Sequence, residues 1–319
     1  MATRGRTIIA GPAAVPVYSP AVVDGDTVYV SGQVALSDDG TKILVGGADV
    51  GLQAAQCLAN LSAVLARAGS SLGQTCMVTI YLTDMSAYGA FNAVYAAALE
   101  SAGVTAPPAR ACFAVEALPL GALVEVEAIA VLDGAPRRVV AGKALFSAAV
   151  VAGKASTVYV AGQVPIDPAS GTIDLVGGDD VQLQAAQSLA NVRAVLEKAG
   201  SSLDLVNKAT VYLADMSGYT PMNESYAAAF AGHMPARSAF AVKALPLGAA
   251  VEICCIASSS DASAANVGRA MVGSAAANKA AAVAPVYSPA VIAGYAGETL
   301  YSAGQIALDK VREEPRLLL

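Results

Sequence analysis

The sequence predicts an α+β protein built from two tandem domains, each a mixed sheet with two helices on one face. The first observation is an internal repeat, because "DVGLQAAQCLANLSAVLARAGSSL" from Asp49 returns as "DVQLQAAQSLANVRAVLEKAGSSL" from Asp180. The second is that each copy alternates a two-residue apolar period with a helical one, in the order ββαβαββ. The third is the offset of 131 residues between Asp49 and Asp180, which is a domain length and not the ~20 to 50 residues of a solenoid unit.

Each element of the first copy follows from its own pattern. "TVYVSGQVAL" predicts a strand pair or a bent strand with Gly32 at the bend. Asp49 is the expected N-cap of a helix that ends at Gly69. The remaining elements are a strand at "MVTIYLTD", a helix at "YGAFNAVYAAALESAG", and two strands at "ARACFAVEAL" and "LVEVEAIAVL".

The repeats also set the expected domain boundaries. We expect one domain over 1–135, a second over 136–260, a linker over 261–283 and a partial third repeat over 284–319. The third repeat rests on "APVYSPAVIAGYAGETLYSAGQIALD", which restates "VPVYSPAVVDGDTVYVSGQVALS" from Val15, and we expect it to hold the opening strands only. The chain has 319 residues, of which 55% are hydrophobic and 14% charged. This composition is that of a well-packed globular protein.

Composition and charge argue against several classes of function. A net charge of -6 without a basic run gives no footprint for nucleic acid. His233 is the only histidine, and the five cysteines show no CxxC spacing, so neither a metal site nor a disulfide framework is expected. Gly, Pro or a charge interrupts every apolar run, so no membrane span is expected. Cytosol is the expected compartment, while Arg4 and Arg6 leave a short organellar presequence open.

One strand of each copy places charge on one of its two faces. In "LVEVEAIAV" the alternation puts Glu125 and Glu127 opposite an apolar face, which the helices require. The second copy keeps Glu252 at the place of Glu125 but has Cys254 at the place of Glu127. A fully solvated face has little reason to carry cysteine, so we interpret this face as partly buried by a partner domain.

Arg110 and Arg237 begin the neighbouring strand of each copy. A charge at the edge of a dry interface costs several kcal/mol in desolvation unless a partner or a ligand compensates it. A structural Arg-to-Glu salt bridge across strands and a ligand-binding arginine are both consistent with this pattern.

The combination of "SGQ" after an early strand, the "QAAQ" and "LAN" helix, and "PAR" followed by Glu in "PLGALVE" resembles the Rid family of reactive intermediate deaminases, also called YjgF or L-PSP. The resemblance covers residues 15–132 and 143–257. It implies a chorismate-mutase-like α+β fold, trimers with clefts at the subunit boundaries, and hydrolysis of enamines and imines, such as 2-aminoacrylate and 2-imino acids, to 2-keto acids and ammonia. It implies no metal or organic cofactor. Some members carry the older label of endoribonuclease or translation inhibitor.

The resemblance also implies roles for individual residues. Arg110 matches the arginine that pairs with the substrate carboxylate, and Glu125 matches the glutamate that positions the attacking water. The residues expected to line the cleft in the first copy are Tyr18, Ser31, Asn92 and Cys112.

The second copy keeps only part of this set. It retains Asn223, Arg237 and Glu252, but has Phe146, Ala161 and Ala239 where the first copy has Tyr18, Ser31 and Cys112. We therefore predict that the first copy carries the better site, although clefts between domains can mix residues of both copies.

Three functions are carried forward: imine deamination, a non-catalytic module that binds a small 2-keto or amino acid, and RNA cleavage, which the acidic charge disfavours. Two full domains do not fill a three-domain ring. The chain must therefore oligomerise, leave one edge bare, or recruit the third repeat at that edge. We favour a homo-oligomer, with an intrachain pseudo-trimer as the alternative.

Overall fold

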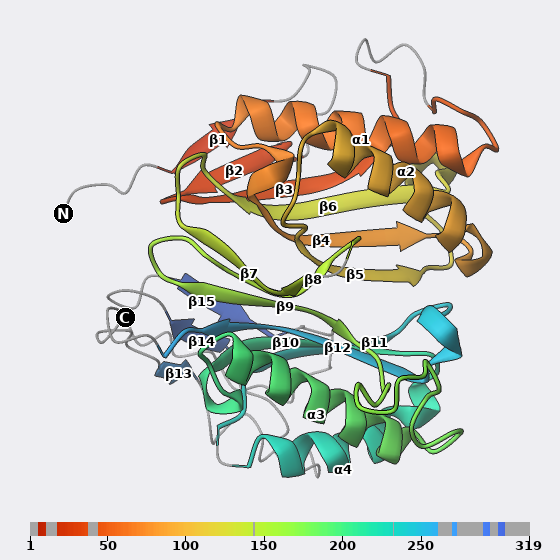
Figure 1. Cartoon of the computed structure of the whole chain (residues 1–319), viewed down its shortest axis with the longest axis vertical. Coiled ribbons are helices and arrows are strands. Elements are labelled where there is room, and N and C mark those ends of the chain that lie inside the picture. Colours follow the sequence, from red (N-terminus) through yellow and green to blue (C-terminus); the bar gives the residue numbers. More distant parts are fainter. Residues whose placement is uncertain are drawn as a thin grey trace, which may run out of the picture.

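The computed structural model describes residues 6–10, 18–37, 44–142, 144–231, 233–260, 270–272, 290–293 and 299–303. Two six-stranded sheets lie face to face, and their helices cover the two outer surfaces, as Figure 1 shows. A third sheet of three short strands lies beside the second copy. The predicted α+β class and its duplication are confirmed.

The first copy contains one mixed sheet and two helices. Its strands are β1 (Thr7–Ile9), β2 (Ala21–Asp24), β3 (Thr27–Val34), β4 (Thr75–Leu82), β5 (Ala109–Ala114) and β6 (Val124–Val131), and its helices are α1 (Val50–Arg67) and α2 (Tyr88–Ser101). The strand order is β1-β2-β3-β6-β4-β5, and only the pair β4 and β5 is parallel. Strand β1 lies outside the predicted pattern.

The second copy repeats the element order of the first copy. The described part of the third repeat contains the three opening strands of that order. The second copy consists of β7 (Arg137–Gly142), β8 (Ser147–Ala152), β9 (Thr157–Gln163), α3 (Val181–Lys198), β10 (Val206–Leu213), α4 (Tyr219–Ala229), β11 (Ala236–Ala241) and β12 (Val251–Ser258). Strands β13 (Ala270–Val272), β14 (Ala290–Ala293) and β15 (Thr299–Ser302) form the third sheet. Strand β13 therefore lies within the stretch expected to be a linker. The rest of that stretch and the segment after Ala303 lie outside the described residues.

Helix α1 begins and ends where the sequence predicts. The Asp49 side chain accepts a hydrogen bond from the Leu52 backbone N–H, which satisfies one of the free donors of the first turn. Gly69 follows the helix with φ of +76°, a conformation that glycine adopts without strain. The helix buries Leu58, Leu61 and Leu65 against the sheet.

Strand β6 shows the predicted alternation. Val124, Val126, Ala128 and Ala130 are buried in the core beneath the helices. Glu125 and Glu127 are half-buried on the opposite face of the sheet.

The stretch around Gly32 forms a β-bulge within one strand, not a strand pair. The register between β3 and β6 shifts between Val30 and Gln33, so Ser31 and Gly32 both lie opposite Glu127. A Cβ on Gly32 would lie 1.7 Å from the Glu125 Oε1 atom. Glycine is therefore required here because the carboxylate of Glu125 lies directly against the bulge.

The helix-free faces of the two sheets pack against each other. The rings of Phe113 on β5 and Tyr212 on β10 lie 4.3 Å apart between centroids. Ala111 and Cys254 belong to the same buried cluster. Glu252 and Cys254 are buried, which confirms that this face of the second copy is covered by a partner domain, here the first copy of the same chain.

The third repeat packs on the second copy in the way that the second copy packs on the first. Ala109, Val150 and Ala161 share a buried cluster between the first two copies, and the equivalent residues Ala236, Val291 and Ala303 form another. The structure therefore shows the third repeat recruited to the second copy, while a closed intrachain pseudo-trimer stays a prediction. Oligomerisation of whole chains stays a prediction.

Candidate active site

Arg110 is buried at the start of edge strand β5 and reaches toward helix α2. Its Nη1 donates a hydrogen bond to Asn92 Oδ1 at 2.8 Å, and its Nη2 donates to the Tyr88 hydroxyl at 2.8 Å. The guanidinium carbon lies 5.5 Å from the ring centroid of Tyr88 and 5.6 Å from that of Tyr95. Two donors thus fix the orientation of the fork and leave further N–H groups for a planar anion.

The second copy supplies the other side of this site. The Phe146 ring lies 5.1 Å from the guanidinium carbon of Arg110. It is held there because the next residue, Ser147, donates its backbone N–H to Pro108 O at 2.9 Å and its hydroxyl to Pro107 O at 2.7 Å. The start of β8 is therefore tied to the loop that leads into β5.

Glu252 on β12 is the acidic residue that interacts with Arg110. Burial raises the pKa of Glu252 to about 8, and the nearby Arg110 guanidinium opposes part of that rise. The side chain is 2% exposed, and its Oε2 has no hydrogen-bond partner within the described part of the chain. A Cβ on Gly162 would lie 1.7 Å from Oε1, so the bulge of β9 sets the position of the carboxylate.

Glu125, which the resemblance pairs with Arg110, lies apart from it. Tyr81 on β4 pairs with Glu125 on β6 and with Phe113 on β5. Arg110 therefore lies two strands away from Glu125 and three residues before Phe113 along β5. These offsets place the two Cα atoms about 14 Å apart. Glu125 also points to the helix-free face, whereas Arg110 contacts α2 on the helix side. Within one chain, Arg110 is therefore brought together with Glu252 and not with Glu125.

The other lining residues predicted in the first copy divide in the same way. Asn92 and Cys112 lie on the Arg110 side, and Cys112 is buried with a pKa raised to about 12 by burial. Tyr18 and Ser31 lie near the bulge of β3, where the Ser31 hydroxyl donates to Ser19 O at 2.6 Å and Tyr18 is exposed. One copy therefore holds two half-sites at separate places in its sheet.

The second copy repeats the arginine half-site. Arg237 donates to Asn223 Oδ1 at 2.7 Å and to the Tyr219 hydroxyl at 3.0 Å, and the Tyr226 ring lies 4.7 Å from its guanidinium carbon. Ala236, beside Arg237, packs on the third repeat. Ala239 is half-buried two residues further along the strand, where the first copy has Cys112.

The two tyrosines on the arginine forks were missed by the sequence reasoning. Each stands four residues before the asparagine on the same helix, Tyr88 before Asn92 and Tyr219 before Asn223. Residues four apart share one face of a helix, so the repeated spacing was a usable signal.

This arrangement can bind and hydrate a small carbonyl-like acid. A planar cation held by two side chains suits a carboxylate. A buried carboxylate oxygen near that cation, without a hydrogen-bond partner among the described residues, suits a water molecule or a proton in transfer. His233 forms an exposed pair with Asp204 at 3.5 Å and lies outside this site. In the described ranges, no group of three metal-ligating side chains occurs and no helix could cross a membrane.

Comparisons with known proteins agree with this architecture. The family model described as Endoribonuclease L-PSP matches residues 8–132 and again 138–259. A RutC family protein of Pyrococcus horikoshii is 46% identical over 112 residues, which are 35% of this chain and 85% of that protein. The 2-iminobutanoate/2-iminopropanoate deaminase of Mus musculus is 46% identical over 101 residues, 32% of this chain and 73% of that protein.

Parts of the chain also resemble solved structures. The YjgF gene product from E. coli is 32% identical and is matched over 98% of its length and 40% of this chain, with a TM-score of 0.37. E. coli TdcF with bound serine is 34% identical over 98% of its length and 39% of this chain, with a TM-score of 0.36. The two family-model matches together cover most of the chain, which therefore belongs to the L-PSP endoribonuclease family, also named Rid or YjgF, as a tandem duplicate.

Proposed function

We propose that the cleft between the two copies hydrolyses reactive 2-imino acids to 2-keto acids and ammonia. The observation that carries the proposal is the Arg110 guanidinium, which Asn92 and Tyr88 of the first copy hold and Phe146 of the second copy covers. Glu252 of the second copy lies near enough for that guanidinium to lower its raised pKa. Relatives named 2-iminobutanoate/2-iminopropanoate deaminase, from mouse and rat among others, support it.

Arg110 binds the substrate carboxylate. Because Asn92 and Tyr88 hold the guanidinium, its remaining N–H groups meet the carboxylate as a preorganised fork. Phe146 closes the side of the fork that faces the second copy and excludes water from the ion pair.

Glu252 handles the protons. A water molecule adds to C2 of the protonated imine while its proton passes to the Glu252 carboxylate. The protonated Glu252 then returns this proton to the nitrogen of the carbinolamine, the C–N bond breaks, and the hydroxyl proton passes back to Glu252 as the C=O bond forms, so that ammonia and the 2-keto acid leave. A pKa of about 8 suits both steps, because near neutral pH the group exists in ionised and protonated forms.

A coupled assay tests the proposal. An L-amino acid oxidase generates a 2-imino acid, semicarbazide traps what remains, and the added protein competes with the trap. Wild type should lower semicarbazone formation. Arg110→Ala should lose on the order of 100-fold in this activity, since removing one partner of a buried charged contact costs ~2 to 5 kcal/mol.

Two matched pairs make the test specific to this cleft. Glu252→Gln should abolish competition with the trap, while Glu125→Gln keeps most of it. Arg110→Ala should be inactive, while Arg237→Ala stays active. Circular dichroism checks that each variant is folded. A wild-type protein that never competes with semicarbazide rules out the proposal, and an inactive Glu125→Gln beside an active Glu252→Gln rules out the assigned pair.

A further inference from the structure

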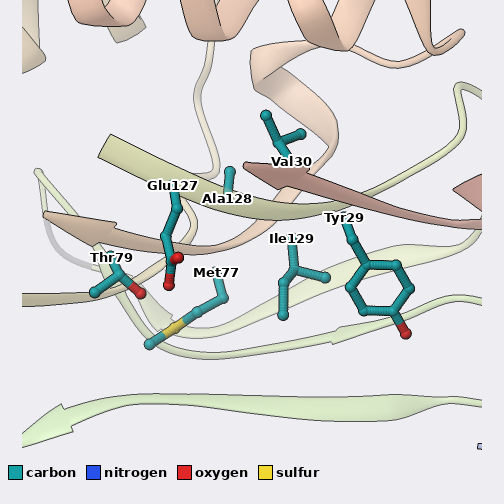
Figure 2. Close-up of a pocket in the computed structure, with 7 residues that line it drawn as sticks. All are labelled: Tyr29, Val30, Met77, Thr79, Glu127, Ala128 and Ile129. Atoms are coloured by element: carbon teal, nitrogen blue, oxygen red, sulfur yellow. The ribbon is translucent and has the colours of Figure 1, made fainter. Parts of the chain in front are cut away.

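A cavity lies on the helix-free face of the first sheet, away from the Arg110 site. It has a volume of about 260 Å³ and is lined by Tyr29, Val30, Met77, Thr79, Glu127, Ala128 and Ile129. None of these residues belongs to the candidate active site. Figure 2 shows that Glu127, Thr79, Met77, Ile129 and Tyr29 point away from the helices and into this space, whereas Val30 points toward the helices.

The register of the sheet explains the shape of the cavity. Ile129 pairs with Tyr29 on one side and with Met77 on the other, so the three side chains form one apolar row across the strands. Thr79 pairs with Glu127 in the next row. The β3 bulge at Ser31 and Gly32 lies opposite Glu127 on the other side.

The charge of the cavity is negative. Among the described residues that line it, Glu127 is the only carboxylic acid, and its carboxylate points into the space. It lies close to the Tyr81 hydroxyl, whose pKa burial and, after it, Glu127 raise. Glu127 also contributes, after burial, to the raised pKa of Glu125 two positions away on the same face. Among the described residues, neither glutamate has a Lys, Arg or His within 4.0 Å.

The remaining walls select against a bare hydrated ion. Met77, Ile129 and the Tyr29 ring present polarizable and apolar surface, which favours an organic body over a hydrated metal. A half-buried carboxylate beside such a surface complements an ammonium group on a short alkyl chain.

We propose that this cavity binds a small organic cation, a primary or quaternary ammonium with a short apolar body. The site is independent of the Arg110 cleft, because the two share no residue and the cleft prefers an anion. Its ligand can therefore bind whether or not the cleft is catalytically active.

Methyl NMR on the whole chain tests the proposal directly. Protein labelled with 13C at the methionine methyl groups is titrated with n-butylammonium, and a Met77→Leu variant assigns the Met77 signal. We expect a saturable shift of Met77 and none of the exposed Met216. Butyrate and n-butanol, which have the same chain length, should not saturate the signal.

Variants then identify the group that recognises the cation. Glu127→Gln should weaken butylammonium binding at least tenfold, while Glu116→Gln, an exposed acid on a loop, leaves it unchanged. Ile129→Phe keeps the Glu127 carboxylate and fills the cavity, so it should abolish binding. It tests the cavity independently of Glu127→Gln, in case that variant folds poorly. Absence of a saturable Met77 shift, equal binding by Glu127→Gln, equal binding of butanol, or binding that survives Ile129→Phe would each overturn the proposal.

Discussion

Replacing Glu252 by glutamine should make the protein more stable at neutral pH and less active at the same time. Glu252 is almost completely buried against Gly162, and burial raises its pKa to about 8 from an ordinary value of 4.5. The folded state therefore favours the neutral acid. Glutamine has nearly the same shape and is neutral at every pH.

The size of the stability effect follows from the two pKa values. Below pH 4.5 the group is protonated in both the folded and the unfolded chain and costs nothing. As pH rises, the unfolded chain releases the proton first, so the free energy of unfolding falls by ~1.4 kcal/mol per pH unit until the folded pKa is reached. The loss is about 3 kcal/mol at pH 7 and about 5 kcal/mol above pH 8. Glu252→Gln removes this pH dependence.

The activity should change in the opposite direction. With a pKa of about 8, roughly one tenth of Glu252 is ionised at pH 7 and roughly one hundredth at pH 6. If the carboxylate is the general base, kcat/KM of the wild type rises about tenfold per pH unit up to pH 8 and then levels off. Glu252→Gln should be flat and low across this range.

Urea unfolding at pH 5, 7 and 9 and rates of trap competition from pH 6 to 9 measure both effects. Glu125→Gln is the matched control, because Glu125 is only half-buried and should show a smaller change in stability. The reasoning fails if wild type and Glu252→Gln differ in stability by the same amount at pH 5 and pH 7. It also fails if the wild-type rate is independent of pH between 6 and 8.

Three further substitutions probe the site and the fold. Gly162→Ala places a methyl group 1.7 Å from the Glu252 carboxylate. By displacing that carboxylate it should lower deaminase activity at least tenfold in the trap assay. Gly73→Ala is the control and should not lower it, because its Cβ would meet only Ser71 Oγ at 3.8 Å. Asn92→Ala releases one arm of the Arg110 fork and should raise KM about tenfold with a smaller change in kcat; an equal effect of the equivalent change in the second copy would contradict the assignment. Asp180→Ala removes the cap that accepts from the first-turn N–H groups of α3 and should cost about 1 kcal/mol in chemical denaturation, and no loss would show that the helix end is held by packing alone.

Local patterns in the sequence were sufficient for most of the fold. The cap at Asp49, the glycine stop at Gly69 and the alternation along β6 each depend on a few adjacent residues, and each is found as predicted. Strand β1 escaped prediction because three residues carry too little periodicity to be distinguished from a loop. The expected bend at Gly32 is present as a β-bulge. Its type could not be predicted because a bulge depends on the register with β6, which lies about a hundred residues away.

The candidate site was predicted in its residue types but not in its pairing. Arg110 and Glu125 belong to one copy and lie fifteen positions apart in the chain. An interpretation that treats each copy separately therefore places them in one site. The structure instead brings Arg110 to Glu252, because β5 of the first copy packs on the sheet of the second. Which two surfaces meet depends on the packing of whole sheets, and no local period encodes that.

This packing changes the interpretation of the divergence between the copies. In a symmetric homotrimer every residue serves every cleft, so a loss at one position impairs all sites. In this fused chain, Arg110 of the first copy and Glu252 of the second serve one cleft. The Arg237 side of the second copy and the Glu125 side of the first copy do not contribute to that cleft and are free to vary. Phe146 and Ala161, which made the second copy look depleted, lie on the glutamate half that faces Arg110, whereas Ala239 lies beside Arg237. We therefore expect Phe146→Tyr to alter the affinity of the Arg110 cleft for its substrate, while Ala239→Cys leaves it unchanged, in a comparison of KM by the trap assay. An effect of Ala239→Cys equal to that of Phe146→Tyr would show that the two clefts are coupled and not independent.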